Sequence, residues 1–137
     1  MNFVLDASVT LAWAFEDEGG EYALGVLARL ETEEACTSAL WPLEISNGLL
    51  VAERHGRMDP AESARFTRLL LALPVVVEPA GRRGIFEQTR ILAQRRQLSA
   101  YDAHYLELAI RQGIPLATLD QGLRQAARAE GVPELEV

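Results

Sequence analysis

The pattern of apolar and polar positions along the chain predicts short strands that alternate with helices. Asn2–Leu5 is a continuous, partly β-branched apolar stretch, as expected for a short buried strand. Further strands are predicted at Ala35–Ser38, Pro74–Pro79 and Pro115–Thr118, with a short edge strand at Leu135–Val137. Strands that alternate with helices predict a parallel sheet covered by helices on both faces.

Boundary residues mark several of the predicted helices. Pro42 fits the first turn of a helix that continues through Leu43–Arg54. Asp59 is a good N-cap for a helix that begins at Pro60 and runs to about Leu73. The remaining helices are predicted at Ser8–Phe15, Gly20–Leu30, Arg83–Arg96, Ala100–Gln112 and Gln121–Glu130. No linker separates these elements, so residues 1–137 are expected to form a single domain.

Composition and cysteine usage narrow the class of protein. The chain has 137 residues, 49% of them hydrophobic, which is enough for one domain with a substantial core. Its longest apolar run, Leu69–Val77, is broken by Pro74 and is shorter than the roughly 20 residues that a membrane helix needs. The N-terminus lacks the layout of a signal peptide, and the single cysteine, Cys36, fits a reducing compartment. We therefore expect a cytoplasmic protein without a membrane segment, with Cys36 in the core.

The net charge and the absence of lysine exclude some functions and leave a few arginines as candidates for RNA contacts. The net charge of −7 argues against a simple electrostatic clamp on a phosphate backbone. All 13 basic residues are arginines, so every mechanism that requires a lysine is excluded. Two arginine pairs, Arg82 with Arg83 and Arg95 with Arg96, are candidates for contacts to an RNA backbone. A solvated helix face with acids nearby explains these pairs equally well.

Four acidic residues stand at or near the starts of predicted helices, where each has an ordinary structural explanation. Asp6 could cap the helix that follows it, and Glu44 lies in a first turn, where the helix dipole favours an acid. The segment from Ser99 to Asp102 has the pattern of a capping box. Asp120 is a natural N-cap for the last helix.

Considered together, the four acids favour a shared site. Asp6, Glu44 and Asp120 each follow a predicted strand, and the segments after parallel strands line the crevice where such sheets bind ligands. Asp102 shares a helix face with Leu106 and so is expected to point inward. Converging carboxylates repel one another and take up protons unless a cation joins them. All-oxygen ligation favours Mg²⁺ or Mn²⁺, which would polarise a phosphate, activate a water and make the acidic crevice attractive to phosphate.

Four motifs, in order along the chain, resemble those of the PIN domain, and most closely the toxin half of the VapBC toxin–antitoxin systems. They are LDAS at Leu5–Ser8, PLEISN at Pro42–Asn47, SAYDAHYLELA at Ser99–Ala109 and LATLD at Leu116–Asp120. The resemblance covers nearly the whole chain. It implies a three-layer α/β/α sandwich with a mostly parallel sheet of four to five strands. It also implies endoribonuclease activity that depends on Mg²⁺, with Mn²⁺ as a substitute.

The resemblance also implies roles for particular residues. The acidic, metal-binding and catalytic set would be Asp6, Glu44, Asp102 and Asp120, supported by Ser8, Thr118 and Asn47. Many PIN domains read T-x-D-x-D-F at the last strand, whereas this chain has Gly122 at the second acid of that motif. One tightly held ion, with another recruited by the substrate, is the arrangement this departure favours. The expected partners are an RNA substrate, a small antitoxin that covers the crevice, and a second copy of the chain.

Other residues of chemical interest have structural explanations. His104 lies two positions from Asp102, on a different face of the predicted helix, so we expect a packing or surface histidine. Trp13, Phe15 and Trp41 are expected in the core, although an aromatic cluster at the mouth of the crevice would also suit an apolar helix of a partner.

Two other functional classes compete with a metal-dependent ribonuclease. A flavodoxin-like phosphoacceptor module needs a lysine near the phosphoryl group, and a haloacid-type phosphatase would have an acid at position 8, where this chain has Ser8. A non-catalytic interaction domain with the same fold is the other alternative. Four mutually repelling carboxylates argue against it, because a binding module has no need of them.

Overall fold

Four short parallel strands form the centre of the molecule. The computed structural model describes residues 1–15 and 20–137. The strands are β1 (Phe3–Leu5), β2 (Ala35–Thr37), β3 (Val75–Val77) and β4 (Leu116–Ala117), in the spatial order β3-β2-β1-β4. Every pairing is parallel, which confirms the predicted sheet type. This order differs from the 2-1-3-4-5 order of flavodoxin-like proteins, so the sheet does not support the phosphoacceptor hypothesis.

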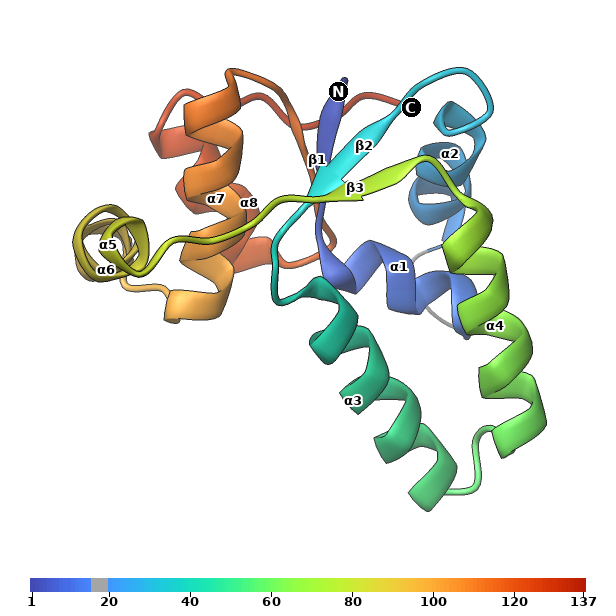
Figure 1. Ribbon diagram of the computed structural model, residues 1–137. Helices are drawn as coiled ribbons and strands as arrows, with labels where there is room; N and C mark the ends of the chain where they lie inside the picture. The colour runs from blue at the N-terminus through green and yellow to red at the C-terminus, as the bar shows by residue number, and fades with distance from the viewer. Residues whose placement is uncertain (16–19) are drawn as a thin grey trace.

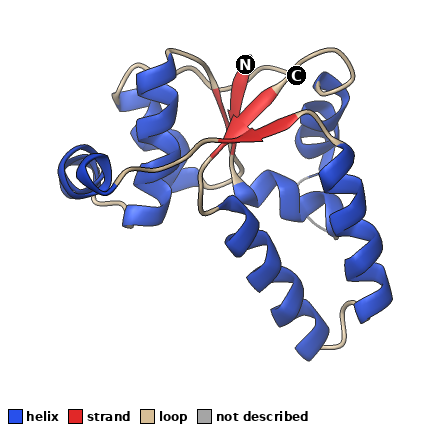
Figure 2. Cartoon of the chain, viewed as in Figure 1, coloured by secondary structure: helices blue, strands red, loops and turns tan. Residues whose placement is uncertain are grey.

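Helices cover both faces of this sheet. They are α1 (Ala7–Ala14), α2 (Gly20–Arg29), α3 (Trp41–Arg54), α4 (Pro60–Ala72), α5 (Arg82–Gly84), the π-helix η1 (Ile85–Thr89), α6 (Arg90–Arg96), α7 (Ala100–Gln112) and α8 (Gln121–Ala129). Figure 1 shows α1–α4 on one side of the sheet and α5–α8 on the other, which is the expected α/β/α sandwich. Both termini lie at one end of the strands, and α1 and α3 begin at the opposite end (Figure 2).

The predicted edge strand at Leu135–Val137 is wrong. In the part of the chain that the structure describes, this region forms one isolated parallel bridge with the sheet, between Leu116 and Glu134, and no strand. Pro133 precedes it and has no N–H to donate to a neighbouring strand, and β4 is itself only two residues long. The segment nevertheless packs on the sheet, since the N–H of Leu135 donates to the Leu116 carbonyl over 3.0 Å.

The predicted helix boundaries hold to within a residue or two, apart from one internal irregularity. The start at Pro60 is fixed by a capping box, in which Asp59 accepts from the Glu62 N–H and Glu62 accepts from the Asp59 N–H. The helix predicted over Arg83–Arg96 contains the π-helix η1 between α5 and α6. The periodicity of apolar residues does not reveal a π-turn, because a π-turn shifts the hydrogen-bond pattern by one residue without interrupting the helix.

Both tryptophans pack within the fold and donate hydrogen bonds there. Trp41 is buried, and its indole N–H donates to Thr10 Oγ1 over 3.0 Å. Trp13 is half-buried and joins α1 to α2 by donating to the Ala23 carbonyl over 2.7 Å. Cys36 is fully buried in β2, as expected, and its burial raises the pKa of the thiol to about 11. In the part of the chain that the structure describes, no helix is long and apolar enough to cross a bilayer.

Candidate functional site

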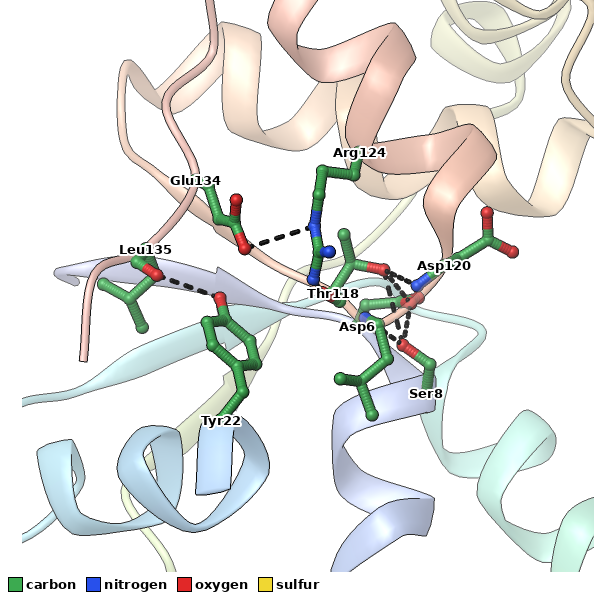
Figure 3. A network of polar contacts seen from close by, with 9 residues as sticks. Asp6, Ser8, Tyr22, Thr118, Asp120, Arg124, Glu134 and Leu135 are labelled. Carbon is green, nitrogen blue, oxygen red and sulfur yellow. Dashed lines mark hydrogen bonds and ion pairs between the residues drawn. The ribbon is translucent and has the colours of Figure 1, made fainter. Parts of the chain in front are cut away.

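Asp6 lies at the switch point of the sheet, where the chain order changes direction between β1 and β4. This is the place where open parallel sheets bind their ligands. Asp6 directly follows β1 at the N-cap position of α1, is 4% exposed, and forms no side-chain capping bond. Its Oδ2 instead accepts hydrogen bonds from Ser8 Oγ (2.6 Å) and Thr118 Oγ1 (2.7 Å), as Figure 3 shows. The capping explanation of Asp6 is therefore wrong, and the carboxylate belongs to a network between two strands.

The two hydroxyls that were expected to support the site are themselves held in place. Ser8 Oγ accepts from the Leu119 N–H over 3.0 Å, and Thr118 Oγ1 accepts from the Asp120 N–H over 3.0 Å. Each hydroxyl can therefore donate to Asp6 while its own lone pair is satisfied by the backbone. Burial raises the pKa of the Asp6 carboxyl, and the hydrogen bonds from Ser8 and Thr118 oppose that rise.

Arg124 supports this network from behind, a role that the sequence did not suggest. Its Nη2 donates to the Thr118 carbonyl over 2.7 Å, and its Nε lies 3.1 Å from Glu134 Oε1 (Figure 3). The hydroxyl of the nearby Tyr22 donates to the Leu135 carbonyl over 3.0 Å. The C-terminal segment thus helps to fix the backbone that carries Thr118. The available signal was the position of Arg124 one turn after Asp120, on the same helix face.

Glu44 and Asp102 approach Asp6 from two different helices. Glu44 lies in the first turn of α3 and Asp102 in the first turn of α7, and both are half-buried. Burial raises the pKa of Glu44 to about 6, and the negative charges of Asp6 and Asp102 add to this effect. Burial also raises the pKa of Asp102, with further contributions from Asp120 and Asp6. The structure therefore brings the predicted acids close enough for each to affect the ionisation of others.

Asp120 has a structural role as well as a place beside the site. It is exposed, and its Oδ1 caps α8 by accepting from the Leu123 N–H over 2.8 Å, as the sequence predicted. The cap of α7 is Ser99, whose Oγ accepts from the Asp102 N–H over 3.1 Å. The serine therefore supplies this cap through the backbone of Asp102.

Tyr105 is a second residue that the sequence reasoning missed. It is 0% exposed, and its hydroxyl has no hydrogen-bond partner among the described residues; the same holds for Glu44 Oε1. Burial and the adjacent charge of Glu44 raise the pKa of Tyr105 well above its ordinary value. A signal was present in the sequence, because Tyr105 lies three positions after Asp102 and so shares its helix face.

The donor set of this site fits a hard divalent cation. Every predicted ligand is an oxygen, and Glu44 Oε1 is buried without a hydrogen-bond partner among the described residues. Burial, together with repulsion from neighbouring carboxylates, raises the pKa of Glu44 and of Asp102. Within residues 1–15 and 20–137, no three His, Cys, Asp or Glu side chains form a ready-made chelating cluster. Mg²⁺ does not require one, because it usually binds through one or two carboxylates and keeps several waters.

The other candidate residues lie on exposed helix surfaces or have partners of their own. Asn47 is exposed on α3, one turn after Glu44. Arg82 and Arg83 are exposed on α5. Arg95 and Arg96 both form ion pairs with Glu130, which agrees with the explanation of a helix face with acids nearby.

His104 is a buried packing histidine, and the surface alternative is wrong. It is 3% exposed, and its Nδ1 lies 2.7 Å from Ser38 Oγ. Burial lowers the pKa of the ring.

Comparison with known proteins assigns the family. The PIN domain model matches residues 3–129. The chain belongs to the PIN-domain family. Ribonuclease VapC9 of Mycobacterium tuberculosis is 33% identical to this PIN domain over 127 residues, which cover 93% of the chain and 92% of VapC9. This relationship agrees with the resemblance drawn from the four sequence motifs.

Solved structures confirm the PIN fold. PAE2754 from Pyrobaculum aerophilum superposes with a TM-score of 0.74 at 24% identity, covering 98% of this chain and 90% of its own. A toxin–antitoxin complex from Klebsiella pneumoniae superposes with a TM-score of 0.62 at 19% identity, covering 87% of each chain.

Proposed function

We propose that this PIN domain is an endoribonuclease of the toxin type, which hydrolyses RNA phosphodiester bonds. The observation that carries the proposal is the group of electrostatically coupled acids, Asp6, Glu44, Asp102 and Asp120, at the switch point of a PIN-domain sheet. The chain is similar over 93% of its length to a protein named as a ribonuclease, and this similarity supports RNA as the substrate. A cytoplasmic site of action is part of the proposal and accords with the single buried cysteine.

The proposed cofactor is Mg²⁺, with Mn²⁺ as a substitute, held by Asp6 and Asp102 and completed by Glu44 and Asp120. When bound, such an ion supplies charge stabilisation to the phosphate and lowers the pKa of a water. Ser8 and Thr118 orient the Asp6 carboxylate through their hydrogen bonds to Oδ2.

We propose that Glu44 gives up its proton when the ion binds. In the metal-free protein burial raises the pKa of Glu44 to about 6, so at neutral pH its carboxylate is largely ionised and available to complete the ligand set. No covalent enzyme intermediate is needed.

The test is cleavage of total RNA by the purified protein, with mapping of the cut ends. The wild type is expected to cleave RNA in Mg²⁺ or Mn²⁺ and to stop in a chelator. The Asp102→Asn variant is expected to be inactive. Asp59→Asn is the matched control, because Asp59 caps the remote helix α4. Cleavage that survives Asp102→Asn would contradict the proposed chemistry.

Calorimetry separates the nuclease from a non-catalytic binding domain. We expect the wild type to bind Mn²⁺ and Asp6→Asn to bind it markedly less. If neither protein binds the ion, the non-catalytic alternative is favoured.

We further propose that the partners are a small antitoxin and a second copy of this chain. The structural similarity to the chain from a toxin–antitoxin complex supports the antitoxin. Growth arrest on induced expression, relieved by a co-expressed small protein that co-purifies with the chain, is the expected result. Light scattering of the purified chain tests the dimer.

A further inference from the structure

One aromatic side chain lies exposed directly beside the acidic site. Within residues 1–15 and 20–137, the exposed aromatic side chains are Tyr101, at 62%, and Phe86, at 64%. Phe86 lies on η1, whereas Tyr101 lies in the first turn of α7, immediately before Asp102. The ring of Tyr101 contributes nothing to the core, and the proposed nuclease chemistry does not use it.

The direction of α7 places Tyr101 at the edge of the sheet where the acids lie. α7 leads into β4, which runs parallel to β1, and Thr118 directly after β4 donates to Asp6. α7 packs against both strands, so its last turn lies near the start of β4 and its first turn lies at the opposite edge. Figure 1 shows α7 beginning at the same end of the sheet as α1 and α3. Tyr101 therefore lies at the mouth of the acidic site.

The geometry of α7 also determines which way Tyr101 faces. Residues four apart lie on one face of a helix, so Tyr101 is one turn from Tyr105 on the same face. Tyr105 is fully buried beside the carboxyl of Glu44, which identifies this face as the one turned toward α3. Helical side chains tilt toward the N-terminus, so the Tyr101 ring leans outward past the first turn. The ring therefore forms part of the rim of the acidic site.

A phosphodiester bound at the acids would bring a neighbouring base within reach of this ring. The Cα atoms of Tyr101 and Asp102 are about 3.8 Å apart, as in any pair of consecutive residues, and the phosphate carries a nucleotide on each side. The acids repel other phosphates of the strand but not its neutral bases. Proteins hold unpaired bases by stacking them on aromatic side chains, whereas the bases of a duplex are already stacked on one another.

We propose that Tyr101 stacks on one unpaired base next to the phosphate that is cleaved, so that the substrate is RNA that is single-stranded at the cut. This role rests on the proposed ribonuclease function for the presence of RNA. Every base has a π face, so stacking on Tyr101 favours single strands over duplexes without selecting a sequence. The competing occupant of the ring is an apolar segment of a protein partner.

The first experiment measures RNA binding by fluorescence anisotropy in Mg²⁺, with every variant built on Glu44→Gln so that the RNA is not cut. The probes are a random-sequence single strand about 12 nucleotides long, an abasic strand with the same phosphates, and a duplex of the same length. Tyr101→Leu should weaken binding of the single strand about fivefold to a hundredfold and leave the other two probes unchanged. Tyr101→Phe keeps the ring and should bind like its parent.

Phe86→Leu is the matched control, because Phe86 is equally exposed but lies on η1. It should bind all three probes like its parent. The loss in Tyr101→Leu should leave the slope of log K against log salt unchanged, because stacking releases no counterions.

Four results would overturn the proposal. They are an unchanged affinity of Tyr101→Leu for the single strand, an equal loss on the abasic strand, an equal loss in Tyr101→Phe, and an equal loss in Phe86→Leu. The first of these is the result expected if a protein partner, and not RNA, covers the ring.

The second experiment compares steady-state cleavage of single-stranded RNA by the wild type and Tyr101→Leu. A contact that holds the ground state and the transition state equally raises KM in the variant and leaves kcat unchanged. A fall in kcat at constant KM would contradict the stacking role. If RNA binds through Tyr101 and the wild type does not cleave it, the proposed function fails and the stacking role holds. If the wild type cleaves and Tyr101→Leu changes neither binding nor KM, the stacking role fails and the proposed function holds.

Discussion

Replacing Glu44 by glutamine is expected to stabilise the metal-free protein while it removes nuclease activity. A carboxyl with a raised pKa in the folded state binds more protons when folded than when unfolded. The free energy of unfolding therefore falls as the pH rises from the ordinary pKa of 4.5 to about 6, and stays lower above that pH. Glutamine has nearly the same shape and carries no charge, so it removes this penalty.

The magnitude follows from the pKa of Glu44. The rise from 4.5 to about 6 corresponds to about 2 kcal/mol at neutral pH. Glu44 is only half-buried, so solvent screening reduces this to about 1 kcal/mol. For a domain of this size, a gain of that magnitude raises the melting temperature by about 3 °C.

The measurement is thermal and urea unfolding of the wild type and Glu44→Gln at pH 4 and pH 8, in a chelator. The variant is expected to be the more stable protein at pH 8 and to show no advantage at pH 4. Added Mg²⁺ should shrink the difference at pH 8, because an ion that binds the folded state stabilises the wild type. Glu31→Gln, at an exposed position, is the control and should show no such pattern. A Glu44→Gln protein that is equally or less stable at pH 8 would refute the electrostatic reasoning.

Further variants and a metal titration test the acidic site and the proposed RNA contacts. Thr118→Val should lower stability by about 1–3 kcal/mol because it removes a hydrogen bond to a buried carboxylate. Tyr105→Phe, which loses a hydroxyl with no hydrogen-bond partner among the described residues, should cost nothing in urea unfolding. The Mg²⁺ concentration for half-maximal cleavage should rise as the pH is lowered through about 6, because a proton on Glu44 competes with the ion; a flat profile in a metal titration would argue against Glu44 as a ligand. Changing both Arg82 and Arg83 to alanine should weaken RNA binding and reduce the slope of log K against log salt by about 1.4, because each phosphate contact on a single strand contributes about 0.7. An unchanged slope would exclude backbone contacts from this pair.

The sequence predicted the sheet type and most helix boundaries because these depend on local patterns. β1 and β2 are continuous apolar stretches, and the start of α4 is a capping box within four residues. The edge strand predicted at Leu135–Val137 failed because pairing depends on what a neighbouring strand offers. β4 has only two residues, and a proline precedes the segment.

The candidate site was predictable as a set of residues but not as a set of contacts. Counting acids after strands identified Asp6, yet its local position suggested a helix cap. The hydrogen bond it forms with Thr118 depends on β1 lying beside β4, which no local pattern specifies. Tyr105 and Arg124 were missed for a related reason: each has an ordinary position on a helix face, and only the folded chain brings it to the carboxylates or to the strand behind them.

The hydrogen bond between Asp6 and Thr118 joins residues that are 112 positions apart. The ribosome therefore makes Asp6 long before it adds Asp102, Thr118 and Asp120. A nascent chain has no complete acidic site until synthesis has passed Asp120. Any activity of this site can begin only after β4 has been made and has paired with β1.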